Sequence, residues 1–87
     1  MSGNPLITVQ ARLYATLRRY RPGVGSGEPI QVELSEGSRV ADLLEALGIP
    51  QNETKQVFVD GRLRLSDYVL KDGEQLGVFP PIAGGAP

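Results

Sequence analysis

One segment of this chain has clear helical periodicity, and its isolation limits the folds that the sequence can adopt. In residues 40–47 the apolar side chains recur every three or four positions, as one face of a helix requires. Ser38 is a favourable N-cap for this helix, and Gly48 supplies the left-handed residue that commonly follows a last turn. We therefore expect one amphipathic helix of about ten residues, which can cover one face of a sheet but cannot enclose a core alone.

The first third of the chain has the two-residue periodicity of β-strands. Apolar and polar side chains alternate through residues 7–14 and again through residues 30–35. Residues 15–20 allow a short helical turn, and a glycine-rich loop, residues 21–28, follows it. These patterns predict two strands that pair as a hairpin.

The last third contains shorter strands. The dipeptide Asp60-Gly61 joins a short apolar strand, residues 57–59, to its continuation at residues 62–65, and it is the strongest two-residue hairpin signal. A polar turn around Asp72-Gly73 precedes a final strand at residues 75–79, in which Leu76 and Val78 share one face and Phe79 lies on the other.

This order of elements predicts an α+β fold, the ubiquitin-like β-grasp. We expect a mixed sheet of four to five strands with one main helix across one face. The ferredoxin-like fold is the alternative, but it requires a second full helix that the sequence lacks. The predicted domain spans residues 1–79, and residues 80–87 form a flexible C-terminal tail.

Composition excludes most kinds of autonomous chemistry. The chain of 87 residues has no cysteine and no histidine, which removes thiolate nucleophiles, Ser-His pairs and Cys-based zinc sites. Its ten acidic residues show no ligand-like spacing, so we expect no metal and no bound cofactor. The net charge of -1 and the lack of a long apolar run favour a cytoplasmic protein that binds neither nucleic acid nor membrane.

The C-terminal segment is apolar where a solvated chain end would be polar. No charged side chain follows Glu74. Pro80 and Pro81 favour an extended path, and Gly84 and Gly85 carry no side chains. Residues 80–85 extended would reach roughly 20 Å, long enough to enter a narrow channel in a partner.

Two motifs resemble the small sulfur-carrier subunit of molybdopterin synthase, over roughly residues 6–85. The first is Arg12-Leu13-Tyr14-Ala15-Thr16-Leu17-Arg18. The second is Asp72-Gly73-Glu74 followed by Val78-Phe79-Pro80-Pro81-Ile82-Ala83-Gly84-Gly85. Thiamine-pathway carriers also end in paired glycines but resemble the chain less, because they lack the Phe-Pro-Pro sequence.

The resemblance implies a protein cosubstrate and not an enzyme. In that family an E1-like enzyme consumes ATP to adenylate the terminal glycine carboxylate, and a sulfur donor converts it to a thiocarboxylate. The carrier then acts as the non-catalytic small subunit that delivers sulfur, within the large subunit of molybdopterin synthase, to a pterin precursor of the molybdenum or tungsten cofactor. By resemblance the reacting residue is Gly85, preceded by Gly84.

The same resemblance implies a docking surface. Its residues correspond to Tyr14, Leu63 and Phe79, and the segment that enters the partner corresponds to Pro80, Pro81, Ile82 and Ala83. Alternation independently places Tyr14 opposite Leu13 and Phe79 opposite Val78, on the face away from the core. For Leu63 the assignment rests on the resemblance alone.

The sequence departs from the family after Gly85, where Ala86 and Pro87 follow. Gly85 then has a peptide bond where activation requires a free carboxylate. We expect a processing peptidase to remove the dipeptide; the alternative is that the protein is not a working carrier. Adenylation at Pro87 is disfavoured because its ring widens the terminus.

Other functions fit the same pattern. The acceptor of sulfur could be a thiamine precursor, a transfer RNA or an amino-acid pathway. The protein could instead be a ubiquitin-like modifier joined to lysines through Gly85, or a non-covalent adaptor. Charged groups near the ends of the predicted sheet, namely Arg18, Arg19, Arg21, Asp72 and Glu74, are either solvated surface or contacts to a partner.

Overall fold

The computed structural model describes residues 5–25, 27–50, 52, 54 and 56–80. The described part contains five strands, one α-helix and one 3-10 helix. In chain order these are β1 (Leu6–Leu13), η1 (Ala15–Tyr20), β2 (Pro29–Ser35), α1 (Val40–Leu47), β3 (Gln56–Val59), β4 (Arg62–Arg64) and β5 (Gln75–Phe79). The described residues end one position beyond β5, so the predicted tail lies almost wholly outside them.

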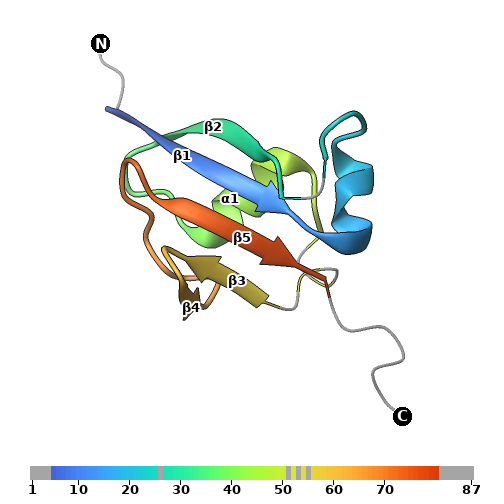
Figure 1. Cartoon of the computed structure of the whole chain (residues 1–87). Helices are drawn as coiled ribbons and strands as arrows, with labels where there is room; N and C mark the ends of the chain where they lie inside the picture. Colours follow the sequence, from blue (N-terminus) through green and yellow to red (C-terminus); the bar gives the residue numbers. More distant parts are fainter. Residues whose placement is uncertain (1–4, 26, 51, 53, 55, 81–87) are drawn as a thin grey trace.

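The five strands form one mixed sheet in the order β2-β1-β5-β3-β4 (Figure 1). The strands β1 and β5 are parallel neighbours in the centre, and the other pairs are antiparallel. Helix α1 crosses one face of this sheet (Figure 1). The arrangement confirms the predicted β-grasp fold.

The strand predictions are confirmed by the burial pattern. In β1 the side chains of Ile7, Val9, Ala11 and Leu13 are buried, whereas the residues between them are partly or fully exposed. Asp60 and Gly61 connect β3 and β4 with φ values of 49° and 85°. Positive φ at both central positions matches the right-handed twist of the flanking strands, which is why Asp-Gly is favoured there.

The start of α1 differs from the prediction. Ser38 is not the N-cap, because the helix begins at Val40 with Arg39 at the N-cap position. The carboxylate of Asp42 accepts a hydrogen bond from the Arg39 N–H at 2.8 Å. Other first-turn donors are bound by a neighbouring loop, since the Val40 N–H donates to the Tyr68 carbonyl at 3.0 Å. A serine hydroxyl is therefore not needed to satisfy them.

The end of α1 agrees with the prediction. Gly48 adopts the left-handed conformation, with φ 76° and ψ 21°. The Ile49 N–H donates to the Leu44 carbonyl at 2.9 Å and closes the last turn.

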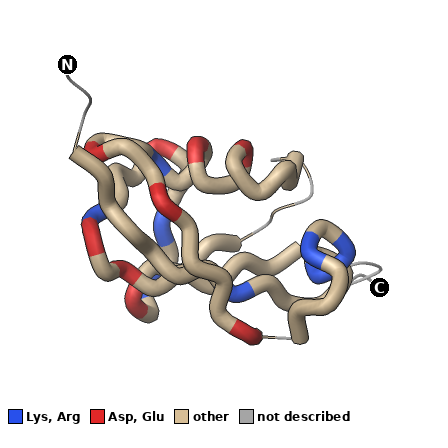
Figure 2. Tube along the Cα trace, turned by 90° about the horizontal axis from the view of Figure 1, so that it is seen from above, with Lys and Arg blue, Asp and Glu red and all other residues tan. Residues whose placement is uncertain are grey.

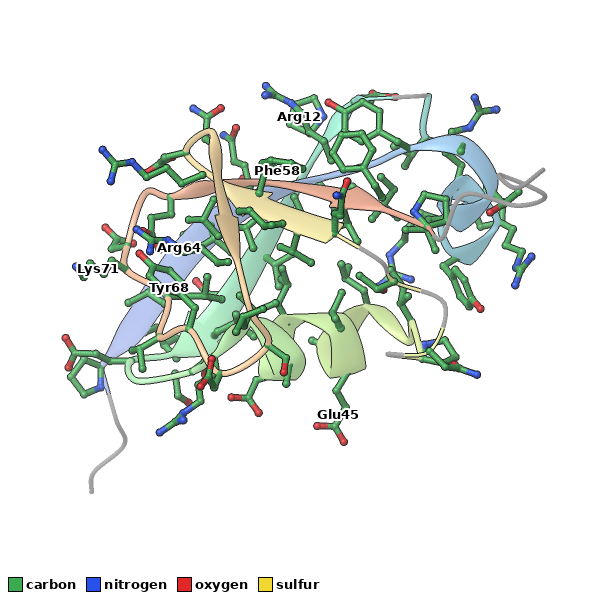
Figure 3. The ribbon with its side chains drawn as sticks, turned by 90° about the horizontal axis from the view of Figure 1, so that it is seen from below. Arg12, Glu45, Phe58, Arg64, Tyr68 and Lys71 are labelled. Carbon is green, nitrogen blue, oxygen red and sulfur yellow. The ribbon has the colours of Figure 1, made fainter. Side chains whose placement is uncertain are left out.

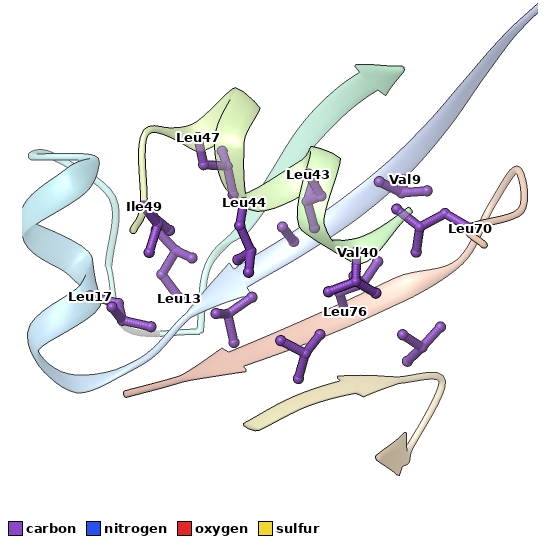
Figure 4. Packing of buried hydrophobic residues seen from close by; sticks show 14 of the residues in the cluster. Val9, Leu13, Leu17, Val40, Leu43, Leu44, Leu47, Ile49, Leu70 and Leu76 are labelled. Carbon is purple, nitrogen blue, oxygen red and sulfur yellow. The ribbon is translucent and has the colours of Figure 1, made fainter. Parts of the chain in front are cut away.

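The core lies between α1 and the sheet (Figure 4). The predicted helical stripe, Val40, Leu43, Leu44 and Leu47, is buried in full. It packs in one hydrophobic cluster with inward side chains of the sheet and with Leu17 of η1. Among the described residues, no helix covers the opposite face of the sheet.

Candidate functional site: the outer face of the sheet

Three aromatic side chains gather on the face of the sheet opposite α1, and we call them the aromatic cluster: Tyr14, Phe58 and Phe79. The rings of Tyr14 and Phe79 stack with centroids 4.5 Å apart and an angle of 3° between their planes. Phe58 meets Phe79 edge-on, with centroids 5.7 Å apart and planes at 86°. Figure 3 shows Phe58 on the side of the sheet away from α1.

The register of three strands brings these rings together. Leu13 pairs with Val78 across the parallel strands, and the Tyr14 N–H donates to the Val78 carbonyl at 3.2 Å. Tyr14 is thereby held beside Phe79. On the other side of β5, Phe58 lies opposite Gly77.

Gly77 provides the space that the aromatic cluster needs. A Cβ atom at this position would lie 3.3 Å from Cε1 of Phe79 and 3.5 Å from Cε2 of Tyr14. The first distance is shorter than an ordinary van der Waals contact, so a side chain would push the rings outward. Glycine at position 77 therefore leaves room for the stacked rings of Tyr14 and Phe79.

Leu63 extends the apolar surface along β4. It pairs with Phe58 in the antiparallel register and is 53% exposed. The structure thus places Tyr14, Leu63 and Phe79, which the family resemblance selected, over one face. Pro80 follows Phe79 directly and is half-buried. The remaining predicted site residues, Pro81, Ile82, Ala83, Gly84 and Gly85, lie outside the described residues.

Phe58 was missed by the sequence reasoning. The signal was present, because Val57 and Val59 flank it and both are buried. Alternation alone therefore places Phe58 on the outer face. What alternation does not give is its neighbour, since the contact with Phe79 depends on which strand lies beside β3.

A polar rim borders the aromatic cluster at the far end of β5. Arg12 donates from Nη1 to Oε1 of Gln75 at 3.2 Å. The Gln75 N–H in turn donates to Oδ1 of Asp60 at 3.0 Å. An apolar centre with a polar border has the composition of a protein-binding surface.

Two acidic residues considered as partner contacts form hydrogen bonds within the chain. Glu74 is only 9% exposed, and its carboxylate accepts hydrogen bonds from the Tyr68 hydroxyl at 2.6 Å and from the Lys71 N–H at 2.7 Å. Asp72 is exposed, and its Oδ1 accepts from the Thr8 N–H at 2.7 Å. Both carboxylates fix the turn that leads into β5.

The arginines around η1 lie at one end of the molecule, whereas acidic residues are spread along α1 (Figure 2). Arg21 has an internal role, because its Nη1 donates to the carbonyl oxygens of Tyr20 at 2.7 Å and Leu47 at 3.3 Å. It thus helps satisfy the C-terminal carbonyls of α1. Arg18 and Arg19 are exposed.

Two kinds of feature are absent from the described residues. No helix there has the length and apolar character needed to cross a membrane. No group of three or more acidic, histidine or cysteine side chains in the described ranges is arranged to hold a metal ion.

Comparisons with known proteins agree with this geometry. The putative molybdopterin converting factor subunit 1 from Pyrococcus furiosus is 27% identical, with a TM-score of 0.68, and the match covers 87% of this chain and 99% of that one. The Haloferax volcanii protein HVO 2177 is 24% identical, with a TM-score of 0.74 and coverage of 98% and 92%. Small archaeal modifier protein 1 of H. volcanii is 21% identical, with a TM-score of 0.68 and coverage of 87% and 99%.

The resemblance inferred from the two motifs is confirmed, since the Pyrococcus protein is described as subunit 1 of a molybdopterin converting factor. In addition, the family model described as Mut7-C ubiquitin matches residues 6–84, which is nearly the whole chain. This protein therefore has the ubiquitin-like β-grasp fold and belongs to the Mut7-C ubiquitin family.

Proposed function

We propose that this protein is a sulfur carrier that docks through the aromatic cluster and presents its C-terminal glycines to a partner enzyme. The observation that carries the proposal is the position of Phe79. This residue is the centre of the aromatic cluster and also the last residue of β5, one position before Pro80. A partner that binds the aromatic cluster is therefore held next to the point at which the C-terminal segment leaves the sheet.

The chemistry requires a free carboxylate at Gly85. In this proposal a peptidase hydrolyses the Gly85–Ala86 bond. An E1-like enzyme then transfers AMP from ATP to the new carboxylate and releases pyrophosphate. A sulfide equivalent displaces AMP and leaves a thiocarboxylate, whose sulfur can pass to an acceptor.

The glycines suit this sequence of steps. A carboxylate becomes an effective electrophile only when AMP is its leaving group, and the activating site must exclude water to prevent hydrolysis. Gly84 and Gly85 add no side chain to the segment that enters such a site. The Pyrococcus similarity favours a pterin precursor of the molybdenum or tungsten cofactor as acceptor, within a complex that has a larger catalytic subunit.

The proposal is tested with two truncated chains, residues 1–85 and 1–84, and the full chain as reference. With a cognate E1-like enzyme, ATP–pyrophosphate exchange should occur with residues 1–85 and be lost with residues 1–84. A sulfur donor should then replace one terminal oxygen with sulfur, which intact mass spectrometry detects.

Equal exchange with both truncated chains would contradict the proposal, because Gly85 would then not be the activated residue. The same reaction mixture separates carrier from modifier. Covalent conjugates to lysine side chains, formed through an activated Gly85, would identify a ubiquitin-like modifier in place of a sulfur carrier.

A further inference from the structure

The strand β2 forms one edge of the sheet, with β1 on one side and no strand on the other among the described residues. Along β2 the backbone N–H and C=O groups of successive residues point alternately toward β1 and away from it. The Glu36 N–H donates to the Pro5 carbonyl at 2.8 Å, just beyond the antiparallel ladder in which Leu6 pairs with Ser35. Every second residue from Glu36 therefore directs its N–H and C=O toward β1.

The residues between those positions direct their backbone groups outward. These are Gln31 and Glu33, each with a free N–H and C=O at the edge, and the two end residues of the strand. Pro29 offers a carbonyl but has no N–H. Ser35 offers an N–H, while its carbonyl already accepts from the Ser38 N–H at 3.0 Å.

We propose that this edge pairs with the β2 edge of a second copy of the chain, antiparallel about a two-fold axis at Val32. In that register Gln31 of one copy faces Glu33 of the other, and their N–H and C=O groups bond reciprocally. Pro29 faces Ser35 of the second copy. Pro29 has no N–H to donate to the Ser35 carbonyl of the second copy, but that carbonyl already accepts from Ser38. The Ser35 N–H of the second copy donates to the free Pro29 carbonyl. Each outward group thus finds a partner.

The side chains support the same register. On the helix side Val32 meets Val32, and Ile30 meets Leu34 of the second copy; all three are only partly buried in the single chain. On the outer side the Gln31 amide faces the Glu33 carboxylate, which is a favourable cross-strand pair.

Neighbouring symmetric registers fit less well. A two-fold axis at Glu33 places identical carboxylates opposite each other, which is destabilising. An axis at Gln31 places Glu33 opposite Pro29, so the Glu33 carbonyl loses its donor.

The two edges of the sheet differ in how they resist pairing. The β4 edge has three residues, of which Arg62 and Arg64 pair with the buried Val59 and Val57 and therefore lie on the helix side. Inward charges and short length are common protections of edge strands. The β2 edge has seven residues and an apolar helix-facing stripe, so it lacks both protections.

The axis is perpendicular to the sheet, as antiparallel pairing of identical strands requires. Both outer faces then point the same way, and both aromatic clusters stay free. The dimer is independent of the proposed carrier function, since activation at Gly85 can succeed or fail whether or not the edge pairs.

Sedimentation velocity of the full chain over a concentration series tests the dimer. An edge interface of this kind is small, so we expect a dissociation constant between about 10 μM and 1 mM. Glu28 lies opposite Glu36 of the second copy at the ends of the interface, and salt should therefore tighten the dimer. Glu33→Pro removes an outward N–H without removing a bond to β1, and this variant should be monomeric while still folded.

Glu33→Gln is the matched control, because it keeps the N–H and should dimerise at least as tightly as the wild type. In wild-type NMR spectra the amide proton signals of Gln31, Glu33 and Ser35 should shift with concentration more than that of Val32, whose N–H points toward β1. A wild-type chain that stays monomeric to about 2 mM would overturn the proposal. Dimerisation of Glu33→Pro as tight as that of the wild type would do the same, since another surface would then be responsible.

Discussion

At the scale of single residues, Glu74 has a role that its sequence context conceals. It follows the turn residues Asp72 and Gly73, where a carboxylate is expected in solvent, yet it is nearly buried and bonded to the Tyr68 hydroxyl. Figure 3 shows Tyr68 beside Arg64, whose guanidinium lies 4.7 Å from the centroid of the tyrosine ring. The hydrogen bond to Glu74 and, less strongly, burial raise the pKa of Tyr68 above its usual value of 10.0.

This raised pKa predicts a loss of stability in alkali. A neutral Tyr68 donates to Glu74, whereas an ionised one would oppose it with a second negative charge. The stabilisation is therefore complete below pH 10.0, the ordinary tyrosine value, and disappears as the pH rises through the higher folded pKa. Tyr68→Phe should melt at a lower temperature than the wild type at pH 7, and the two melting temperatures should converge above the folded pKa. A gap that stays constant into strong alkali would contradict this assignment.

At the scale of elements, the ends of α1 are determined by groups of different origin. Its C-terminus is encoded locally by Gly48, as the sequence predicted. The N–H groups at its N-terminus donate to two kinds of acceptor: the Asp42 carboxylate within the helix and carbonyls of the loop that precedes β5. One of these carbonyls is that of Ser66, which accepts from the Ala41 N–H at 3.0 Å. The helix is consequently hydrogen-bonded to a segment more than twenty positions away in the sequence. Ser38 does not cap the helix; its carbonyl accepts a hydrogen bond from the Leu70 N–H.

The contribution of Asp42 can be measured directly. Asp42→Ala removes the acceptor of the Arg39 N–H and the negative charge at the positive end of the helix dipole. We expect the free energy of unfolding in urea to fall by about 1 kcal/mol. Glu45→Ala is the control, because Glu45 lies on the exposed side of the same helix (Figure 3) and should change stability by less than about 0.5 kcal/mol. Equal losses in both variants would show that helix propensity, and not capping, is responsible.

At the scale of the whole molecule, the aromatic cluster forms because β5 lies between β1 and β3. This order places Phe79 between Tyr14 and Phe58, which come from strands far apart in the chain. The three rings are partly buried on the outer face, and aromatic side chains are enriched among interface hot spots. The sheet therefore holds the aromatic cluster next to Pro80, where the C-terminal segment begins.

Phe58 should be a main anchor in docking. In adenylation assays with residues 1–85 and a cognate E1-like enzyme, Phe58→Ala should raise the KM for the carrier about tenfold, with little change in kcat. Leu65→Ala is the matched control, because Leu65 is 73% exposed but forms no part of the aromatic cluster. An unchanged KM for Phe58→Ala, or an equal rise for Leu65→Ala, would remove the cluster from the docking surface.

The sequence by itself determined the elements and the face to which most side chains belong. The two-residue alternation of Ile7 to Leu13, the helical spacing of Val40 to Leu47 and the Asp60-Gly61 turn are local patterns, and each is confirmed by the structure. Local patterns are readable because they depend on the periodicity of the backbone alone. The outer face was predicted for Tyr14 and Phe79 by the same reasoning, but both side chains are partly buried and not exposed, because their rings stack on each other.

Only the tertiary structure decided which exposed side chains are neighbours. The parallel pairing of β1 with β5 joins the two ends of the domain, and no local pattern encodes it. It brings Tyr14 to Phe79 and leaves β2 at an edge of the sheet, while the antiparallel pairing of β3 with β5 places Phe58 opposite Gly77. Tertiary contacts also bury Glu74, whose sequence context is that of a solvated turn. The order of strands in a sheet depends on contacts between segments that are distant in the sequence. The sequence therefore predicted the strands and the face on which each side chain lies, but not which side chains are neighbours on that face.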